Sequence, residues 1–227
     1  MFQRLFGTAL VAGLLVGLLT AGLQQFTTTP LIKAAEVFEV AEAGPAVTAG
    51  AVSAGHEHHL DDWKPAEGLQ RFLYTSGATV LISVGFSLVL VALMALKGDR
   101  VSARTGLLWG AAGFAAISLA PAIGLPPEVP GMPTADLGAR QLWWIATALS
   151  TGAGLWMIAF SRSRIGIAIA VALIAIPHIF GAPIAPPTES NVPAELAARF
   201  TTVSLGLAVA FWSMLGAASG FLFNRWR

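Results

Sequence analysis

The chain has 227 residues, of which 56% are hydrophobic and 11% are charged, and its formal net charge is +1. A soluble domain carries about 25% charged residues, so this composition excludes a soluble globular protein of similar size. The absence of cysteine excludes disulfides and thiolate metal sites.

Five long segments contain no Lys, Arg, Asp or Glu, and a sixth apolar segment is shorter. Because a bilayer-spanning helix needs roughly 20 mainly apolar residues, these segments predict an all-α integral membrane protein. We expect one membrane domain over residues 1–227, with six transmembrane helices arranged as three helical hairpins. The predicted spans are residues 5–26, 72–96, 105–124, 141–161, 165–180 and 200–223. The first apolar run is too long for a signal peptide and is interpreted as a retained helix.

The connections between the predicted spans alternate between short basic turns and longer loops. Residues 27–71 are expected to form an outside loop that carries the His-rich segment 56–62, and residues 31–42 within that loop favour a helix. Four prolines within residues 124–133 exclude regular structure after the third span. A second proline-rich loop, residues 183–193, precedes the sixth span.

The charged residues sort between alternate connections. One set holds a single acid, Asp99, and these bases: Arg4, Lys97, Arg100, Arg104, Arg162, Arg164, Arg225 and Arg227. The other set holds the remaining five bases and eleven acids. Since Lys and Arg of short loops stay on the cytoplasmic side, this pattern predicts that both termini are cytoplasmic and that the His-rich segment faces outward.

Three similar segments precede the second, fourth and sixth spans, and each has an acid followed four residues later by an arginine. The pairs are Glu67 and Arg71, Asp136 and Arg140, and Glu195 and Arg199. An acid and an arginine at this spacing share one face of a helix. The segments fit either three independent helix starts or a weak threefold parallel repeat, whose pairs would line one outer vestibule.

The His-rich segment is the richest source of metal ligands in the chain. It contains His56, His58 and His59 beside Glu57, Asp61 and Asp62. Imidazole and carboxylate ligands suit Co²⁺, Ni²⁺ and Zn²⁺, and short His-rich tracts are typical of metal binding. We interpret the segment as a collector of divalent metal, with an incidental polar loop as the alternative.

A second group of candidate ligands lies in the other two outside loops. His178 ends the fifth span beside Pro177, and an ionisable residue at membrane depth is a functional candidate, although a histidine that wets the interface is the alternative. Glu128 and Glu189 belong to the two proline-rich loops. We expect Glu128, His178 and Glu189 to form a second metal site, and all four histidines then lie on the acidic side.

Several short motifs resemble those of one known family. They are His56-Glu57-His58 before Trp63-x-Pro65, Gly124-Leu125-Pro126-Pro127-Glu128-Val129-Pro130-Gly131, Arg140-Gln141-x-Trp143-Trp144, and Pro177-His178 with Gly181-Ala182-Pro183. Over nearly its whole length the chain resembles CbtA, a family of predicted cobalt transporter subunits. The resemblance implies a bacterial inner-membrane protein of about five spans that acts in cobalt uptake. It also implies a partner, a small one-span subunit with its own His-rich tail. The charge pattern favours six spans instead.

The sequence therefore favours a membrane subunit that admits Co²⁺, or Ni²⁺ or Zn²⁺, as a transported ion, with no permanently bound cofactor and no enzymatic activity. The absence of a Gly-x-x-x-x-Gly-Lys-Ser/Thr motif excludes an ATP site of that kind. Two alternatives stay open. One is a membrane enzyme whose arginines recognise phosphate or carboxylate, and the other is a metal-sensing or assembly protein that transports nothing itself.

Overall fold

The computed structural model describes residues 2–42, 65–98, 101–187 and 190–226, and within these ranges every regular element is a helix. In chain order they are α1 (Phe2–Phe26), α2 (Thr28–Glu42), α3 (Leu69–Lys97), α4 (Ala103–Gly113), the π-helix η1 (Phe114–Leu119), α5 (Ala120–Gly124), α6 (Leu137–Phe160), α7 (Arg164–Phe180) and α8 (Ala194–Arg225). The predicted all-helical membrane fold is confirmed.

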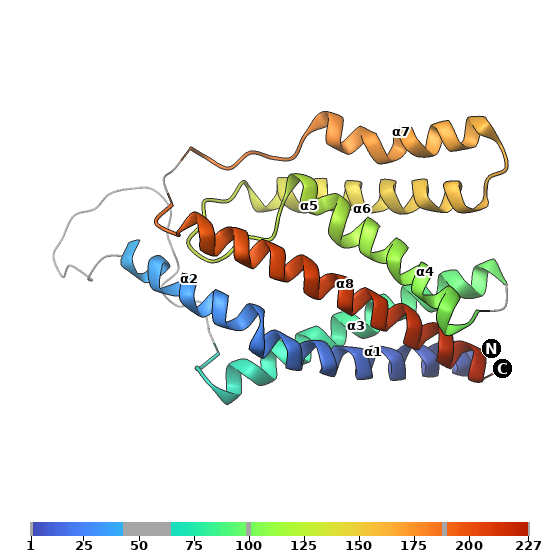
Figure 1. Ribbon diagram of the computed structural model, residues 1–227, viewed down its shortest axis with the longest axis horizontal. Coiled ribbons are helices and arrows are strands. Elements are labelled where there is room, and N and C mark those ends of the chain that lie inside the picture. The colour runs from blue at the N-terminus through green and yellow to red at the C-terminus, as the bar shows by residue number, and fades with distance from the viewer. Residues whose placement is uncertain (1, 43–64, 99–100, 188–189, 227) are drawn as a thin grey trace.

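Within the described ranges, five stretches are long and apolar enough to cross a membrane. They are α1, α3, the continuous run α4–η1–α5, α6 and α8. The helix α7 has 17 residues. At about 1.5 Å per residue it is shorter than the roughly 30 Å hydrocarbon core. The predicted sixth span is therefore not confirmed. Figure 1 shows α7 alongside α6 at the edge of the bundle, and both termini at one end.

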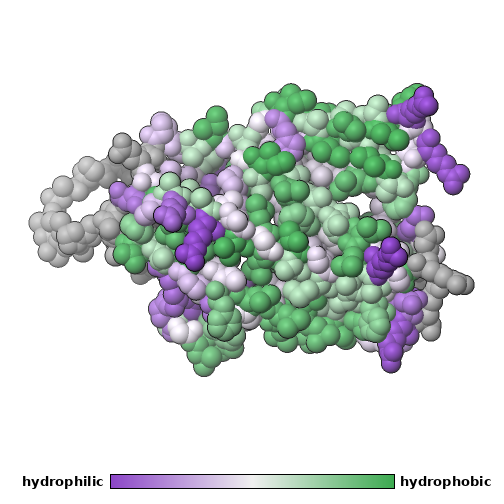
Figure 2. Space-filling model, viewed as in Figure 1, coloured by the Kyte–Doolittle hydropathy of each residue, from purple (hydrophilic) through white to green (hydrophobic). Residues whose placement is uncertain are grey.

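The surface divides into an apolar belt and two polar ends. Figure 2 shows hydrophobic residues over the middle of the molecule and hydrophilic residues gathered at its two ends. Large apolar side chains on the belt are highly exposed, including Leu81 at 75% and Leu149 at 69%. Such a face is stable when lipid covers it, since lipid tails are as apolar as leucine. We call the end away from the termini the distal end.

The helices pack closely where small residues meet. A Cβ atom built on Gly13 of α1 would lie 2.5 Å from the Cα of Val84 in α3. A Cβ atom built on Gly106 of α4 would lie 2.2 Å from the carbonyl oxygen of Gly216 in α8. Without a hydrophobic driving force between helices in lipid, such close backbone approach supplies packing energy. These contacts place α1, α3, α4 and α8 around one core.

A π-helical turn interrupts the third span. In η1 the amide of Ala120 donates to the carbonyl of Ala115, five residues earlier, and Pro121 directly after it has no amide hydrogen to donate. Trp212 of α8 donates its indole N–H to the Ser118 hydroxyl at 3.1 Å. The wider turn is thereby tied to the neighbouring helix.

A second apolar cluster holds the two proline-rich loops at the distal end. Its buried members come from α2, both loops and the start of α8, and they are Leu31, Ala35, Val129, Val192 and Phe200. The Thr201 hydroxyl donates to the carbonyl of Pro127 at 2.9 Å, and Ser190 donates to the carbonyl of Gly131 at 3.1 Å. The loops are therefore fixed against the helices, which positions the side chains they carry.

Candidate functional site

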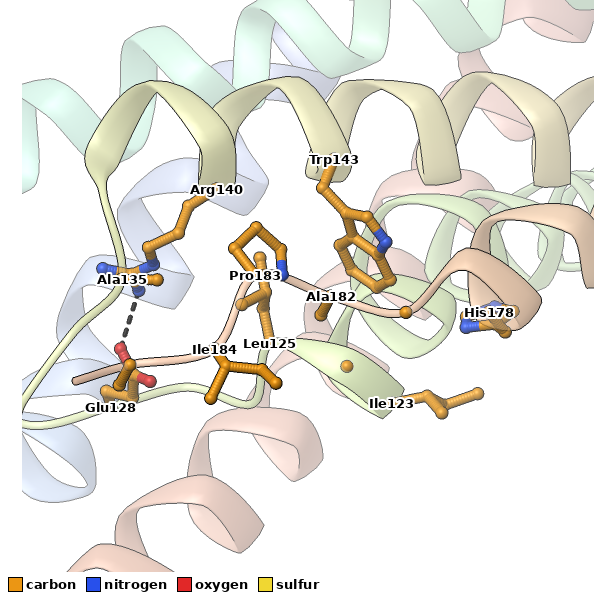
Figure 3. A pocket seen from close by; sticks show the side chains of 13 residues that line it. Ile123, Leu125, Glu128, Ala135, Arg140, Trp143, His178, Ala182, Pro183 and Ile184 are labelled. Carbon is orange, nitrogen blue, oxygen red and sulfur yellow. Dashed lines mark hydrogen bonds and ion pairs between the residues drawn. The ribbon is translucent and has the colours of Figure 1, made fainter. Parts of the chain in front are cut away.

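A pocket of about 480 Å³ lies at the distal end, between the start of α6, the end of α7 and the loop after α5. Glu128, Arg140, Trp143 and His178 line it, and most of the remaining wall is glycine, alanine, proline and aliphatic residues. Glu128 and His178 were predicted as ligands from different loops. The structure brings both to one cavity, as Figure 3 shows.

Glu128 is held by an arginine from the neighbouring helix. Arg140 Nη2 donates to Glu128 Oε2 at 2.7 Å, and the two side chains are 28% and 20% exposed. A charge-assisted contact of this kind is about twice as strong as a neutral hydrogen bond. The pocket therefore presents one carboxylate already neutralised by a fixed cation.

Trp143 joins three elements in the lining of the pocket. Its indole N–H donates to the carbonyl of Pro177 at 3.2 Å, and its ring centroid lies 5.9 Å from that of His178, at an interplanar angle of 75°. A Cβ atom on Gly124 would lie 2.5 Å from the Trp143 ring, so the ring also packs on the end of α5. In Figure 3 Trp143 lies between Arg140 and His178.

The chain as a whole matches one family. The family model described as "Probable cobalt transporter subunit (CbtA)" matches residues 2–224. The chain belongs to the CbtA family. No curated protein and no solved structure matches it significantly. Family membership and the apolar helices together establish a multi-pass membrane protein with the role of a transporter subunit in cobalt transport.

The three predicted acid–arginine pairs of this CbtA protein make different contacts in the structure. Arg71 Nη1 donates to Glu67 at 2.6 Å, as the spacing predicts. Arg140 contacts Glu128 instead of Asp136, whose carboxylate accepts a 2.9 Å hydrogen bond from the amide of Ala139. In the described part of the chain, no ion pair joins the exposed side chains of Glu195 and Arg199.

The reason is that each acid sits at a different position relative to its helix. Glu67 precedes the N-cap residue Gly68, Asp136 is itself the N-cap of α6, and Glu195 is the second helical residue after the N-cap Pro193. The oxygens of an N-cap carboxylate accept hydrogen bonds from backbone amides of the first turn. The threefold repeat is therefore not confirmed, because the three acids stand at different positions relative to their N-caps.

Arg71 forms the centre of a larger cluster between α2 and α3. It donates to both carboxylate oxygens of Glu36, one of them at 3.1 Å, and Lys33 lies 3.2 Å from Glu67. Hydrogen bonds from Arg71, and then from Lys33, lower the pKa of Glu67. Sequence reasoning missed Glu36 as a partner, although its position on the acidic face of α2 was a usable signal.

The remaining predicted ligands of the CbtA chain lie outside the described residues, and they are His56, His58, His59 and Glu189. Over residues 2–42, 65–98, 101–187 and 190–226, no group of three or more His, Cys, Asp or Glu side chains is placed to hold a metal ion. The pocket thus contributes one imidazole and one paired carboxylate to any metal site. Trp143, which the sequence analysis named only as part of a family motif, is the pocket residue whose role was missed.

Proposed function

We propose that this chain is the membrane protein through which Co²⁺, or a similar divalent cation, enters a bacterial cell across the inner membrane. The observation that carries this proposal is the meeting of Glu128 and His178 in one pocket at the distal end. Among the described residues, Glu36, Glu67, Asp136 and Glu195 lie in the same half, which attracts cations electrostatically. The distal end would face outward.

We further propose that α7 crosses the membrane as a sixth span, with both termini in the cytoplasm. Support comes from the contact between the two ends of the chain. Arg4 Nε donates to the carbonyl of Phe223 at 3.1 Å, and the Arg4 guanidinium lies 4.0 Å from the centre of the Phe223 ring. Termini that meet on one side require an even number of crossings.

In this proposal the His-rich segment binds the metal first, and the pocket at the distal end binds it second. His56, His58 and His59 would capture hydrated metal, and His178 with Glu128 and Glu189 would bind it nearer the membrane. Arg71 and Arg140 would shape the electrostatics of the entrance through their paired carboxylates. Because Glu128 is paired with Arg140 at 2.7 Å, a cation must compete with the guanidinium for that carboxylate, which favours weak and reversible binding.

A second candidate function, a membrane enzyme that recognises a phosphate or carboxylate, rests on the presence of Arg140 in the pocket. Arg140 is already paired with Glu128, so its positive charge is compensated and it is not free to bind a substrate anion. The ion pair therefore favours transport over the enzyme. The word "subunit" in the family description implies a partner. We propose that this partner is the small one-span protein with a His-rich tail.

The experiment is metal accumulation in metal-starved cells that express this chain with and without the partner, with Co²⁺, Ni²⁺ and Zn²⁺ compared. Cobalt accumulation that depends on this chain is expected. Cobalt accumulation by the partner alone would indicate an assembly or sensing role instead. An activity on a phosphorylated or carboxylated substrate that is lost in Arg140→Ala, without metal, would indicate the enzyme.

A further inference from the structure

Two threonines lie buried in α6, deeper than the pocket. The side chains of Thr147 and Thr151 are 0% and 3% exposed. Neither hydroxyl has a hydrogen-bond partner among the residues that the structure describes. A buried polar atom left without a partner costs about 1–3 kcal/mol. A valine would fill the same volume without that cost, and these two hydroxyls belong to the helix whose residues Arg140 and Trp143 line the pocket.

These hydroxyls are two of five buried hydroxyls that lack a partner in the described helices, and the other three are those of Thr8 and Thr20 in α1 and Ser76 in α3. A helical Ser or Thr commonly donates to a carbonyl three or four residues earlier. Ser150, between the two threonines, donates in this way at 3.1 Å, and Thr201 and Thr202 of α8 do so at 3.0 and 2.9 Å. Thr147 and Thr151, which we call the threonine pair, do not make this bond.

The threonine pair lies on the face of α6 that carries Trp143. Residues four apart follow one another along one side of a helix. Trp143, one turn above Thr147, bonds to Pro177 of α7, and Gly154, below Thr151, packs against the carbonyl of Ala170 in α7. The pair therefore faces α7 over the stretch of α6 that follows the pocket-lining residue Trp143.

The helices around the threonine pair have irregular backbone hydrogen bonding. Pro177 lies inside α7 and has no amide hydrogen for the carbonyl of Leu173, one turn earlier. On the other side of α6, Gly152 faces Ala116 of the π-helix η1, at 4.0 Å from its Cβ. Irregular backbone at membrane depth is tolerated where it lines a cavity or is buried in protein. The break at Pro177 lies on the α7 side of α6, as the threonine pair does, whereas the π-turn lies on the opposite side.

We propose that the threonine pair lines the intramembrane part of a cation path that begins at the pocket, with Trp143 as the closed gate between them. This inference rests on the proposed function. Hydroxyl and carbonyl oxygens are neutral ligands that suit a divalent cation in transit, because a path must bind an ion weakly enough to release it. The pocket would load the ion, and displacement of the Trp143 ring would admit it.

The native chain contains no cysteine, so a single thiol reports on one position. Thr147→Cys and Thr151→Cys would be treated in intact cells with a cationic, membrane-impermeant methanethiosulfonate reagent, with and without Co²⁺. Thr20→Cys is the matched control, since Thr20 is 4% exposed with an unpartnered hydroxyl and lies in the half of α1 nearer the distal end. We expect labelling at position 147 at least roughly tenfold faster than at position 20, slowed by Co²⁺, and accelerated further by Trp143→Ala.

Labelling at positions 147 and 151 no faster than at position 20 would overturn the path, and continued cobalt accumulation by the native chain would leave the proposed function standing. If Co²⁺ does not slow the labelling, and cells that express the native chain accumulate no cobalt, both the path and the proposed function are overturned. A second measurement uses Thr147→Val with Thr151→Val, which preserves packing. A roughly tenfold lower cobalt uptake rate is expected, with Thr8→Val unchanged, and equal rates would contradict the path.

Discussion

Arg140 in the first turn of α6 donates a 2.7 Å hydrogen bond to Glu128, twelve residues earlier in the proline-rich loop. The contact fixes a loop that carries no regular structure against a helix that enters the membrane. It also places a cation and an anion together at the wall of the pocket, where each side chain neutralises the charge of the other.

The first prediction concerns this ion pair. Glu128→Gln leaves the half-buried Arg140 cation without its anion at the pocket wall, and we expect both lower stability, by about 1–3 kcal/mol, and lower cobalt uptake. The reversed pair, Glu128→Arg with Arg140→Glu, should recover much of the stability. Thermal unfolding in detergent and uptake at limiting cobalt measure the two effects. A double variant no better than the sum of its single changes would contradict the pairing.

His178 is predicted to bind the metal directly. Loss of an imidazole ligand in His178→Ala should reduce cobalt uptake at limiting concentration roughly tenfold, in line with the 10–100-fold effects typical of metal-site changes. Phe180→Ala, two residues along the same helix, serves as control because that side chain is 85% exposed and faces away from the pocket lining. Equal uptake in the two variants would remove His178 from the site.

The His-rich segment should matter most when metal is scarce. Replacing His56, His58 and His59 together with alanine removes the proposed collector, so uptake should fall at limiting cobalt and recover at saturating cobalt. The measurement is the initial uptake rate across a range of cobalt concentrations. Unchanged uptake at the lowest concentration would show that the segment is an incidental polar loop.

Two glycines of α1 provide a test of helix packing. In Gly13→Ala the new methyl group would lie 2.5 Å from backbone of Val84, which forces α1 and α3 apart and should cost about 1–3 kcal/mol. Gly22→Ala is the matched control, because nothing lies within 4 Å of its Cβ position. Only the first change should lower the thermal midpoint. Equal midpoints would contradict close packing at Gly13.

The cluster around Arg71 predicts that the stability of the protein depends on pH in the acid range. Arg71 and Lys33 lower the pKa of Glu67 below its ordinary value of 4.5. The folded state therefore gains stability from ionised Glu67 above pH 4.5, and loses it as the pH falls through the lowered pKa. Glu67→Gln should flatten this part of the pH profile of unfolding. A profile identical to that of the native chain would exclude the contribution.

Much of the fold could be predicted because its signal is local. An apolar run without charge has to satisfy every backbone group internally, so it becomes a helix in lipid wherever the run is long enough. The contact between Glu67 and Arg71 was likewise predicted from their spacing of four residues, although Glu67 lies just before the N-cap of α3 and not inside the helix. The short segment that became α7 falls near the length limit, and there composition alone does not settle a crossing.

Patterns along the chain were enough to establish the helical membrane scaffold, the family motifs and the sorting of charge between alternate loops. The packing of the folded chain was needed to show that Arg140 pairs with Glu128, that Trp143 in the pocket lining bonds to Pro177, and that the hydroxyl of Thr147 is buried without a partner among the described residues. The periodicity of the sequence predicts which residues form a helix and which face of that helix is apolar. The partner of a side chain depends on loop closure and on which helix packs opposite, and distant parts of the chain set both.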